Sequence, residues 1–276
     1  MTTAAPASDA PVLEAEALTL RFGGLTSLSE VSLAMRAGEV LAVIGPNGAG
    51  KTSLFNSLTG VYQPQEGRVR FRAEDGTEHQ LLGRKPHLVN RLGVARTFQN
   101  IRLFGALSAL ENVQVAAQSR QRTGPVGIAL GLPHARRAER VSARRARELL
   151  EFVGLGAQLN EPAGSLSYGA QRRLEIARAL ATDPRVVLLD EPAAGTNPTE
   201  KLELTDLIRQ INRELGVGVL LIEHDMRLVM SVADRVVVLN FGKVIAEGTP
   251  AEIQRDPAVI AAYLGAEAAH TEGSQL

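Results

Sequence analysis

Residues 45–52 read Gly45-Pro46-Asn47-Gly48-Ala49-Gly50-Lys51-Thr52, and this stretch decides the fold. It fits the pattern G-x-x-x-x-G-K-[ST], in which glycines let successive backbone N–H groups turn toward one anion. A helix that starts at the end of the loop adds the positive end of its dipole. Lys51 supplies positive charge for the terminal phosphates of a nucleotide, and the Thr52 hydroxyl is suited to Mg²⁺. The stretch therefore predicts a loop that binds ATP.

The sequence on both sides of the loop supports this interpretation. An apolar run, Val40–Ile44, precedes it as a buried strand would, and 52–58 follows with a helical pattern. An ordinary glycine-rich turn would not require a lysine, and the chain has only four, at positions 51, 85, 201 and 243. The candidate ATP-binding residues of this segment are Gly45, Pro46, Asn47, Gly48, Ala49, Gly50, Lys51, Thr52 and Ser53.

A second motif, at residues 186–191, consists of four apolar residues followed by Asp190 and Glu191. A buried strand would deliver both acids at its carboxyl end, where α/β folds bind ligands. Adjacent residues of a strand point in opposite directions, so we expect two roles. Asp190 would hold Mg²⁺ or its water, and Glu191 would orient and deprotonate the water that attacks the γ-phosphate. The alternative is that the two acids only cap the end of a strand. The presence of a phosphate-binding loop in the same chain disfavours this alternative.

Strand and helix patterns alternate along the chain, and this favours an α/β fold with a mainly parallel central sheet. We predict strands at 12–20, 31–35, 40–44, 69–71, 94–97, 186–189, 217–222 and 236–239. We predict helices at 52–58, 110–120, 142–153, 174–181, 198–213 and 226–233. Because 100–170 carries only helical patterns, we expect a helical insertion subdomain there.

Composition narrows the class of protein. The chain has 276 residues, 45% hydrophobic and 22% charged, with a formal net charge of +0, so nothing attracts it generally to nucleic acid. It has no cysteine, which excludes disulfides and thiolate metal sites. The longest apolar runs, 127–133 and 215–222, are far shorter than the roughly 18–20 residues that cross a bilayer. Residues 1–11 lack the pattern of a signal peptide and predict a flexible tail. Any role at a membrane is expected to come through a partner protein.

Residues 166–171, Leu-Ser-Tyr-Gly-Ala-Gln, resemble the L-S-G-G-Q signature of ABC ATPases. Tyr168 replaces the first glycine of the pair, and Ala170 intervenes before Gln171. Ser167 and the backbone of Gly169 can still donate hydrogen bonds to a γ-phosphate at the start of a helix. Ser167 can also be a plain helix cap, and the two roles are compatible.

Four further positions match motifs of the same family. Gln99 lies where the Q-loop glutamine reaches Mg²⁺ and senses the permease, and His224 matches the switch histidine that contacts the γ-phosphate. Phe22 matches the aromatic residue that stacks on adenine, although packing at the rim of the core is the alternative for a lone aromatic after a strand. Residues 194–197 occupy the position of the D-loop, which lines the dimer interface.

Longer stretches resemble one subfamily, the G-type ATP-binding subunit of branched-chain (hydrophobic) amino acid importers. These stretches are 20–25, 96–104, 166–178, 190–195, 221–226 and 261–265. The resemblance covers nearly all of 12–265, and Tyr168 is usual in this subfamily. Thr196, where leucine is usual, and Ser108-Ala109 depart from its pattern at positions that do not touch phosphate.

The resemblance implies a P-loop NTPase (RecA-like) core with an N-terminal antiparallel β part, spanning 12–250, and a C-terminal helical extension and tail at 251–276. It also implies two ATPase subunits facing head to tail, with each ATP between one P-loop and the partner's Ser167, Tyr168, Gly169 and Gln171. The second subunit would be a related F-type chain or another copy. The other expected partners are transmembrane permease subunits and, indirectly, a periplasmic solute-binding protein, so the location implied is the cytoplasmic face of the inner membrane.

Several alternatives stay open. The solute could instead be urea, an amide or an aromatic acid. An ABC ATPase acting on DNA or ribosomes would need a long coiled coil or two tandem cassettes, and neither is present. A regulator that binds ATP without turnover is disfavoured because Glu191 and His224 are intact. The arginines at 137, 140, 144 and 147 favour a solvated helix face over a lipid or nucleic-acid contact. Residues 100–112 could form the groove that accepts the permease or could take part in ordinary core packing, and the sequence favours neither.

Overall fold

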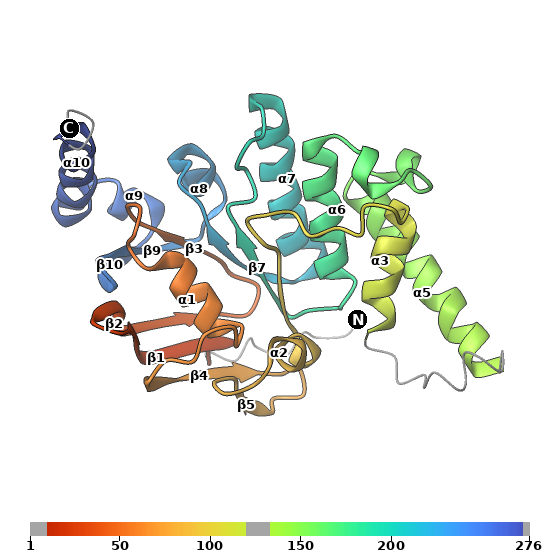
Figure 1. The fold of residues 1–276 in the computed structure, drawn as a ribbon, viewed down its shortest axis with the longest axis horizontal. Coiled ribbons are helices and arrows are strands. Elements are labelled where there is room, and N and C mark those ends of the chain that lie inside the picture. The colour runs from red at the N-terminus through yellow and green to blue at the C-terminus, as the bar shows by residue number, and fades with distance from the viewer. Residues whose placement is uncertain (1–9, 120–132, 273–276) are drawn as a thin grey trace, which may run out of the picture.

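The computed structural model describes residues 10–119 and 133–272, and it contains two sheets (Figure 1). The first is antiparallel, with strand order β2-β1-β4-β5. Its strands are β1 (Leu13–Phe22), β2 (Leu25–Met35), β4 (Glu66–Arg72) and β5 (Glu78–Gln80). The second has strand order β10-β9-β3-β8-β7-β6, and all its neighbours are parallel except β10 and β9. Its strands are β3 (Val40–Ile44), β6 (Val94–Arg96), β7 (Val186–Asp190), β8 (Gly218–Ile222), β9 (Arg235–Asn240) and β10 (Lys243–Gly248). The predicted mainly parallel sheet and the N-terminal antiparallel part are confirmed.

The three central strands β3, β8 and β7 are buried along their whole length. Each is a continuous apolar run, as expected of a parallel strand that is covered on both faces. One face packs against the antiparallel sheet and α1 (Lys51–Leu58). The other face is covered at one end by α8 (Met226–Val232), α9 (Pro250–Ile253) and α10 (Pro257–Glu272), and toward β7 by α6 (Tyr168–Leu180) and α7 (Pro198–Leu215). This layering brings the carboxyl ends of β3, β7 and β8 to one edge.

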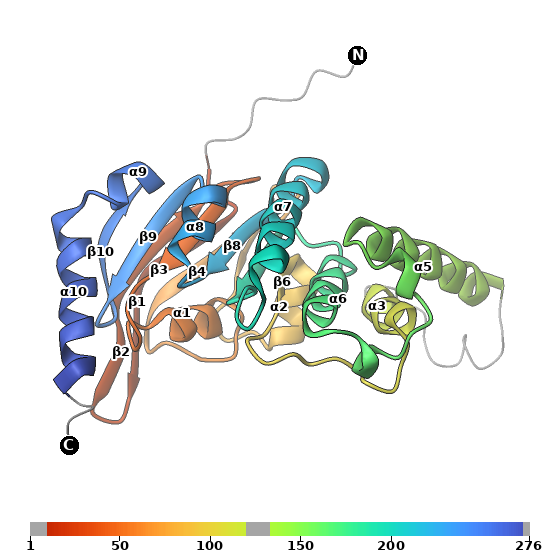
Figure 2. The same ribbon diagram turned by 90° about the horizontal axis from the view of Figure 1, so that it is seen from above.

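A helical lobe stands at the opposite end of the molecule from α10 (Figure 2). It consists of α3 (Ala109–Gln118), α5 (Pro133–Phe152) and α6, with short turns at Gly156–Gln158 and Ala163–Ser165. Ser108 caps α3 in a reciprocal pair with Glu111, which fixes the start of the lobe. On α5 the predicted apolar face is inward, with Ala146, Leu150 and Val153 buried and Ala143 half-buried. The arginines at 137, 140, 144 and 147 are exposed, as a solvated face requires.

Several boundaries differ from the sequence prediction for physical reasons. Helix α6 begins at Tyr168, not at 174, because the Ser167 side chain caps it. The edge strand β10 was missed because none of its residues is buried, so it carries no apolar alternation. Short α2 (Pro86–Leu92), β5 and α9 were missed for lack of a periodic stretch. The predicted tail 1–11 and the apolar run 127–133 lie almost wholly outside the described residues. In the part of the chain that is described, no helix is both long and apolar enough to span a bilayer.

Candidate active site

The loop between β3 and α1 has a backbone that two glycines make possible. Gly45 has φ 149°, and an added Cβ would lie 2.1 Å from the Leu239 carbonyl oxygen. Gly50, at φ 103°, precedes the first residue of α1, and its Cβ would lie 2.7 Å from the Ser27 carbonyl oxygen. Neither position has room for a side chain, so the loop turns tightly with its N–H groups near the N-terminus of α1. This is the anion-binding geometry expected of residues 45–52.

Lys51 is buried under this loop. Its Nζ donates to the carbonyl oxygens of Gly45 at 2.7 Å and Pro46 at 2.9 Å. Burial lowers the pKa of Lys51, and the negative charges of Glu191 and Asp190 act in the opposite direction. The ammonium group is therefore held by the loop and lies within the electrostatic influence of Asp190, the last residue of β7, and of Glu191, which follows it. Thr52 is exposed at the first turn of the helix, and the neighbouring Ser53 hydroxyl accepts a hydrogen bond from Ser27.

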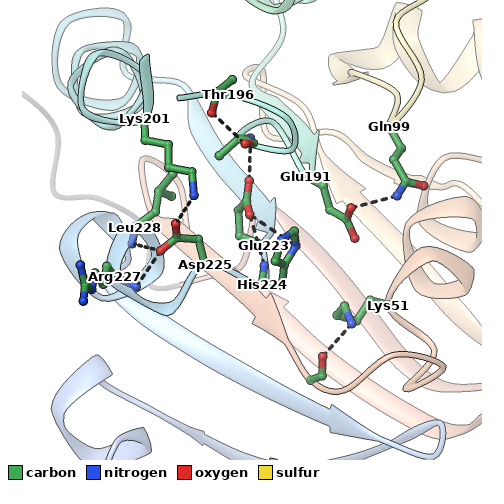
Figure 3. Close-up of polar contacts among 12 residues, drawn as sticks. Lys51, Gln99, Glu191, Thr196, Lys201, Glu223, His224, Asp225, Arg227 and Leu228 are labelled. Carbon is green, nitrogen blue, oxygen red and sulfur yellow. Dashed lines mark hydrogen bonds and ion pairs between the residues drawn. The ribbon is translucent and has the colours of Figure 1, made fainter. Parts of the chain in front are cut away.

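Glu191 and Gln99 meet at the edge of the sheet (Figure 3). Glu191 follows β7 in a left-handed conformation, with φ 47°, and its N–H donates to the Ile222 carbonyl oxygen at 2.9 Å. Its Oε2 accepts a hydrogen bond from Gln99 Nε2 at 2.9 Å. A non-glycine residue in this conformation is uncommon and is typical of functional sites. The structure thus brings together two candidate site residues that lie 92 positions apart, Glu191 as the predicted base and Gln99 as the predicted Q-loop residue.

Asp190 has a partner that the sequence analysis missed. Its Oδ2 accepts from Arg96 Nη2 at 2.7 Å, and both side chains are almost fully buried. The same guanidinium donates to Asn56 Oδ1 at 2.7 Å and Thr59 Oγ1 at 3.1 Å, which ties β6 to α1. Arg96 therefore fixes the position of Asp190. An arginine in a short apolar strand carries no local signal of this role, because its partners lie on two other elements, β7 and α1 with its C-cap.

The oxygen donors near the P-loop fit Mg²⁺ bound with a nucleotide. Across the described residues there is no group of three or more His, Cys, Asp or Glu side chains that could hold a metal ion. The candidates are the Thr52 hydroxyl, the Asp190 carboxylate and the Gln99 amide oxygen. Mg²⁺ in nucleotide enzymes is usually held by one or two carboxylates together with substrate phosphates. This donor set matches that pattern and does not match a metal cage built by protein alone.

His224 lies on the loop after β8, with its side chain 65% exposed. Figure 3 shows it at the same edge of the sheet as Lys51, Gln99 and Glu191. Its Nδ1 is 3.9 Å from Oε2 of the neighbouring Glu223. The exposed imidazole is free of packing that would prevent it from meeting a phosphate. Parallel strands β7 and β8 pair in register from Val186 with Gly218 to Asp190 with Ile222, so their following residues arrive together.

Phe22 is the last residue of β1 and is 46% exposed. Its ring makes an edge contact with Tyr62, with centroids 5.2 Å apart and an interplanar angle of 75°. Burial in the core is therefore excluded for Phe22, and packing at the rim of the core remains the alternative to stacking on adenine. An aromatic ring that is half open to solvent and held on one side by another ring can offer a face to a base.

The signature residues lie on the helical lobe. Ser167 is the N-cap of α6, where its Oγ accepts from the Ala170 N–H at 3.3 Å. Gln171 turns back, and its Nε2 donates to the Leu166 carbonyl oxygen at 2.9 Å. A Cβ at Gly169 would lie 2.4 Å from Glu200 Oε1, so a side chain there would require the end of the Glu200 side chain to move. Tyr168 is exposed and packs beside Gly195, where a Cβ would be 3.2 Å from its ring.

Arg172 joins this signature helix to the Q-loop, which the sequence analysis also missed. It is nearly fully buried and donates to the Phe98 carbonyl oxygen at 2.9 Å, the Gln99 carbonyl oxygen at 2.5 Å and the Tyr168 hydroxyl at 2.8 Å. Glu175 completes the contact, since its Oε1 accepts from the Phe98 N–H at 3.3 Å. Burial raises the pKa of Glu175, and the hydrogen bond from Phe98 and the charge of Arg172 oppose that rise. Arg172 thus positions the backbone whose side chain reaches Glu191.

We expect Arg172→Met to lower ATP turnover about tenfold and to leave ATP affinity within about twofold of wild type. The change removes two hydrogen bonds to the backbone of Phe98 and Gln99 and one to the Tyr168 hydroxyl, so Gln99 is no longer held against Glu191. The matched control is Arg173→Met, which removes an exposed ion pair with Glu203 and should leave turnover unchanged. Equal turnover in the two variants would show that Arg172 does not position the Q-loop.

Comparison with known proteins identifies the family. A family model described as ABC transporter matches residues 28–194, and one described as branched-chain amino acid ATP-binding cassette transporter matches 243–269. The high-affinity branched-chain amino acid transport ATP-binding protein BraF of Pseudomonas aeruginosa is 49% identical over 92% of this chain and 98% of its own length. LivG of Escherichia coli K12, which has the same description, is 45% identical over the same shares. Among solved structures, the ADP conformation of the ABC transporter cassette MJ1267 has a TM-score of 0.78 at 30% identity, covering 92% of this chain and 99% of that one.

The P-loop, the two carboxylates at the carboxyl end of β7 and the signature helix on the helical lobe define an ATP-binding cassette. The chain belongs to the ABC transporter family as an ATP-hydrolysing subunit. Within that family it groups with the branched-chain amino acid transport ATP-binding proteins, which it matches along nearly its whole length.

Proposed function

We propose that this chain hydrolyses ATP to drive uptake of branched-chain amino acids through a separate permease. The observation that carries the proposal is the match at both ends of the chain: the relatives named for this transport cover 92% of it, and the C-terminal model named for it covers 243–269. The ATPase subunit does not need to touch the solute, so urea, an amide or an aromatic acid is the competing class of cargo.

We further propose the following roles at the site. Glu191 deprotonates the attacking water, Gln99 orients Glu191, and His224 meets the γ-phosphate. Residues 45–53 hold the phosphates, and Phe22 stacks on adenine. Thr52, Asp190 and Gln99 would hold Mg²⁺, which when bound neutralises charge on the phosphates. The hydrogen bond between Gln99 and Glu191, the burial of Lys51 and the Arg96–Asp190 pair support these roles.

The signature segment is proposed to act on the ATP of a second subunit, which is an F-type chain or another copy. Its residues are Ser167, Tyr168, Gly169 and Gln171. Their place on the helical lobe, separated from the P-loop in Figure 1, supports an action between subunits.

The permease is proposed to dock on this lobe, where a groove is lined by Phe98, Arg102, Phe104, Val115 and Arg178. Phe104 and Val115 are about half exposed in it. A periplasmic solute-binding protein would supply the solute, and the chain would work at the cytoplasmic face of the inner membrane.

We also propose that 12–250 is the ATPase domain, that about 100–170 within it is the helical subdomain, and that 251–276 is an extension. Helix α10 lies at the end of the molecule away from the lobe, which supports treating it as an addition to the core.

The proposal is tested by uptake of labelled leucine, urea and an aromatic acid in cells whose only copy of this chain carries Lys51→Ala. We expect leucine uptake to be lost and the other two to be unchanged. Loss of urea or aromatic-acid uptake with normal leucine uptake would assign the chain to another solute. Lys243→Ala, at an exposed lysine of β10, is the control.

A further inference from the structure

Two loops that carry the catalytic candidates lie side by side in Figure 3. One is 191–197, which follows β7 and contains Glu191; the other is 223–225, which follows β8 and contains His224. A backbone hydrogen bond from the Glu191 N–H to the carbonyl oxygen of Ile222, the last residue of β8, joins the starts of the two loops at 2.9 Å. Two further side-chain contacts join them on either side of His224, and neither is explained by contact with a nucleotide.

The first contact is made by Glu223, whose side chain is fully buried. Its Oε1 accepts from the Ala193 N–H at 2.7 Å, and its Oε2 accepts from the His224 N–H at 3.2 Å. Burial raises the pKa of Glu223, and the bond from Ala193 is the largest influence in the opposite direction. Among the described residues, the one basic side chain within ion-pair distance of this carboxylate is the His224 imidazole, whose Nδ1 lies 3.9 Å from Oε2.

A buried carboxylate without a firm counter-charge opposes folding, because its desolvation is only partly offset by two neutral hydrogen bonds. Stability alone therefore does not account for an acid at this position. The two hydrogen bonds fix backbone positions. Through them the Glu223 carboxylate holds the backbone of the loop after Glu191 and the backbone of His224 at the same time.

The second contact is the ion pair of Lys201 and Asp225, with Nζ 2.7 Å from Oδ2. Lys201 lies in the first turn of α7, directly after the 191–197 loop, and it is one of only four lysines in the chain. Asp225 is the N-cap of α8, and its Oδ1 accepts from the N–H groups of Arg227 and Leu228. One oxygen of the Asp225 carboxylate therefore binds α7 and the other caps α8. The hydrogen bond from Lys201 holds the pKa of this carboxyl below its usual range.

We infer that Glu223 and the Lys201–Asp225 pair form a clasp that positions Glu191 and His224 as one unit. This inference rests on the roles proposed above for those two residues. The loop of the clasp also contains Gly195, which packs against the Tyr168 ring of the signature segment, and its turn is closed by the Thr196 hydroxyl on the Ala193 carbonyl oxygen. A displacement of 193–197 is thus transmitted to the main chain of His224. Glu223, Lys201 and Asp225 are positioning residues and do not touch the reacting atoms.

The test compares variants of the full chain, purified in its transporter complex, by measuring the kcat and KM of ATP hydrolysis and ATP affinity. We expect Glu223→Ala to lower kcat by about 10- to 100-fold, with KM and affinity within about threefold of wild type. Glu223→Gln keeps the acceptor for the Ala193 N–H but not the one for His224, so its kcat should lie between those of Glu223→Ala and wild type.

The ion pair is tested by a double-mutant cycle. Asp225→Asn keeps the helix cap and removes the charge, and Lys201→Met keeps the alkyl stem. Each should lower kcat about threefold, and the double variant should be no worse than either single one, since both remove one interaction. The controls are Lys243→Met and Asp206→Asn, both at exposed positions, and they should behave as wild type.

A wild-type kcat for Glu223→Ala would overturn the clasp, and so would a loss of its kcat that is matched by an equal loss of ATP affinity. Additive effects of Lys201→Met and Asp225→Asn on kcat would also overturn it. The same holds if the control variants lose as much kcat as the clasp variants. Glu191→Gln is measured in parallel. If it turns over ATP like wild type, the proposed roles fail and the clasp fails with them. If it is inactive while Glu223→Ala is fully active, only the clasp is wrong.

Discussion

Replacing Glu191 by glutamine is expected to lower ATP turnover about a thousandfold while ATP still binds. A positioned general base contributes roughly 10²–10⁴ to a rate, and an amide cannot take the proton of the attacking water. The substituted side chain keeps a carbonyl oxygen that can accept from Gln99 Nε2, so the geometry of the loop is preserved. It also removes a negative charge that faces Lys51, so affinity for the anionic phosphates should not fall.

The measurement is single-turnover hydrolysis of labelled ATP, combined with gel filtration in the presence of ATP of the chain alone and of the chain with the F-type subunit proposed as its alternative partner. Glu191→Gln should hold ATP in a closed dimer of subunits that persists for longer than the wild-type dimer. Glu203→Gln, at an exposed residue of α7, is the matched control and should be fully active. Normal turnover by Glu191→Gln would place the general base elsewhere.

Lys51→Ala is expected to weaken ATP binding by about 10- to 100-fold and to reduce turnover below detection. A hydrogen bond to a charged group contributes about 1.5–3 kcal/mol, which corresponds to this range of affinity. The loss in turnover is larger because the ammonium also meets charge that develops on the transferred phosphoryl group. Titration with a fluorescent nucleotide measures the affinity, with Lys243→Ala as the control. Wild-type affinity and turnover in Lys51→Ala would remove residues 45–52 from the site.

The central fold was predictable because its signals are local. Continuous apolar runs such as Val186–Leu189 are typical of strands covered on both faces, and the structure buries every residue of β3, β7 and β8. Strand β10 was not predictable in this way, since an exposed edge strand needs no apolar pattern. The start of α6 depended on a single cap, Ser167, and the apolar periodicity alone placed it several residues too late.

The candidate site was predictable where its residues follow strands or lie in a continuous motif. Parallel strands end at one edge, so Glu191 and His224 had to arrive near the loop that contains Lys51. Arg96, Arg172 and Glu223 were not predictable, because each acts through partners on distant elements. Arg96 reaches from β6 to Asp190, and Arg172 reaches from α6 to the backbone of Gln99. Nothing beside them in the sequence distinguishes them from a solvated arginine or a capping acid.

Tyr168 shows how a departure from a general motif can have a structural cause within the chain. Its hydroxyl accepts from Arg172 and its ring packs beside Gly195, so it lies between the signature helix and the loop that follows Glu191. A glycine at this position could make neither contact. The aromatic residue therefore contributes to the intramolecular packing of the cassette, whatever the segment contacts across a dimer.

The first measurement to make is leucine-dependent ATP hydrolysis by this chain reconstituted with its permease, in the presence of the solute-binding protein proposed above. If the chain drives branched-chain amino acid uptake from the site described, leucine raises ATP turnover and transport together, and Glu191→Gln abolishes both. Leucine transport that continues in the Glu191→Gln complex, or ATP turnover that urea or an aromatic acid stimulates and leucine does not, would contradict the account.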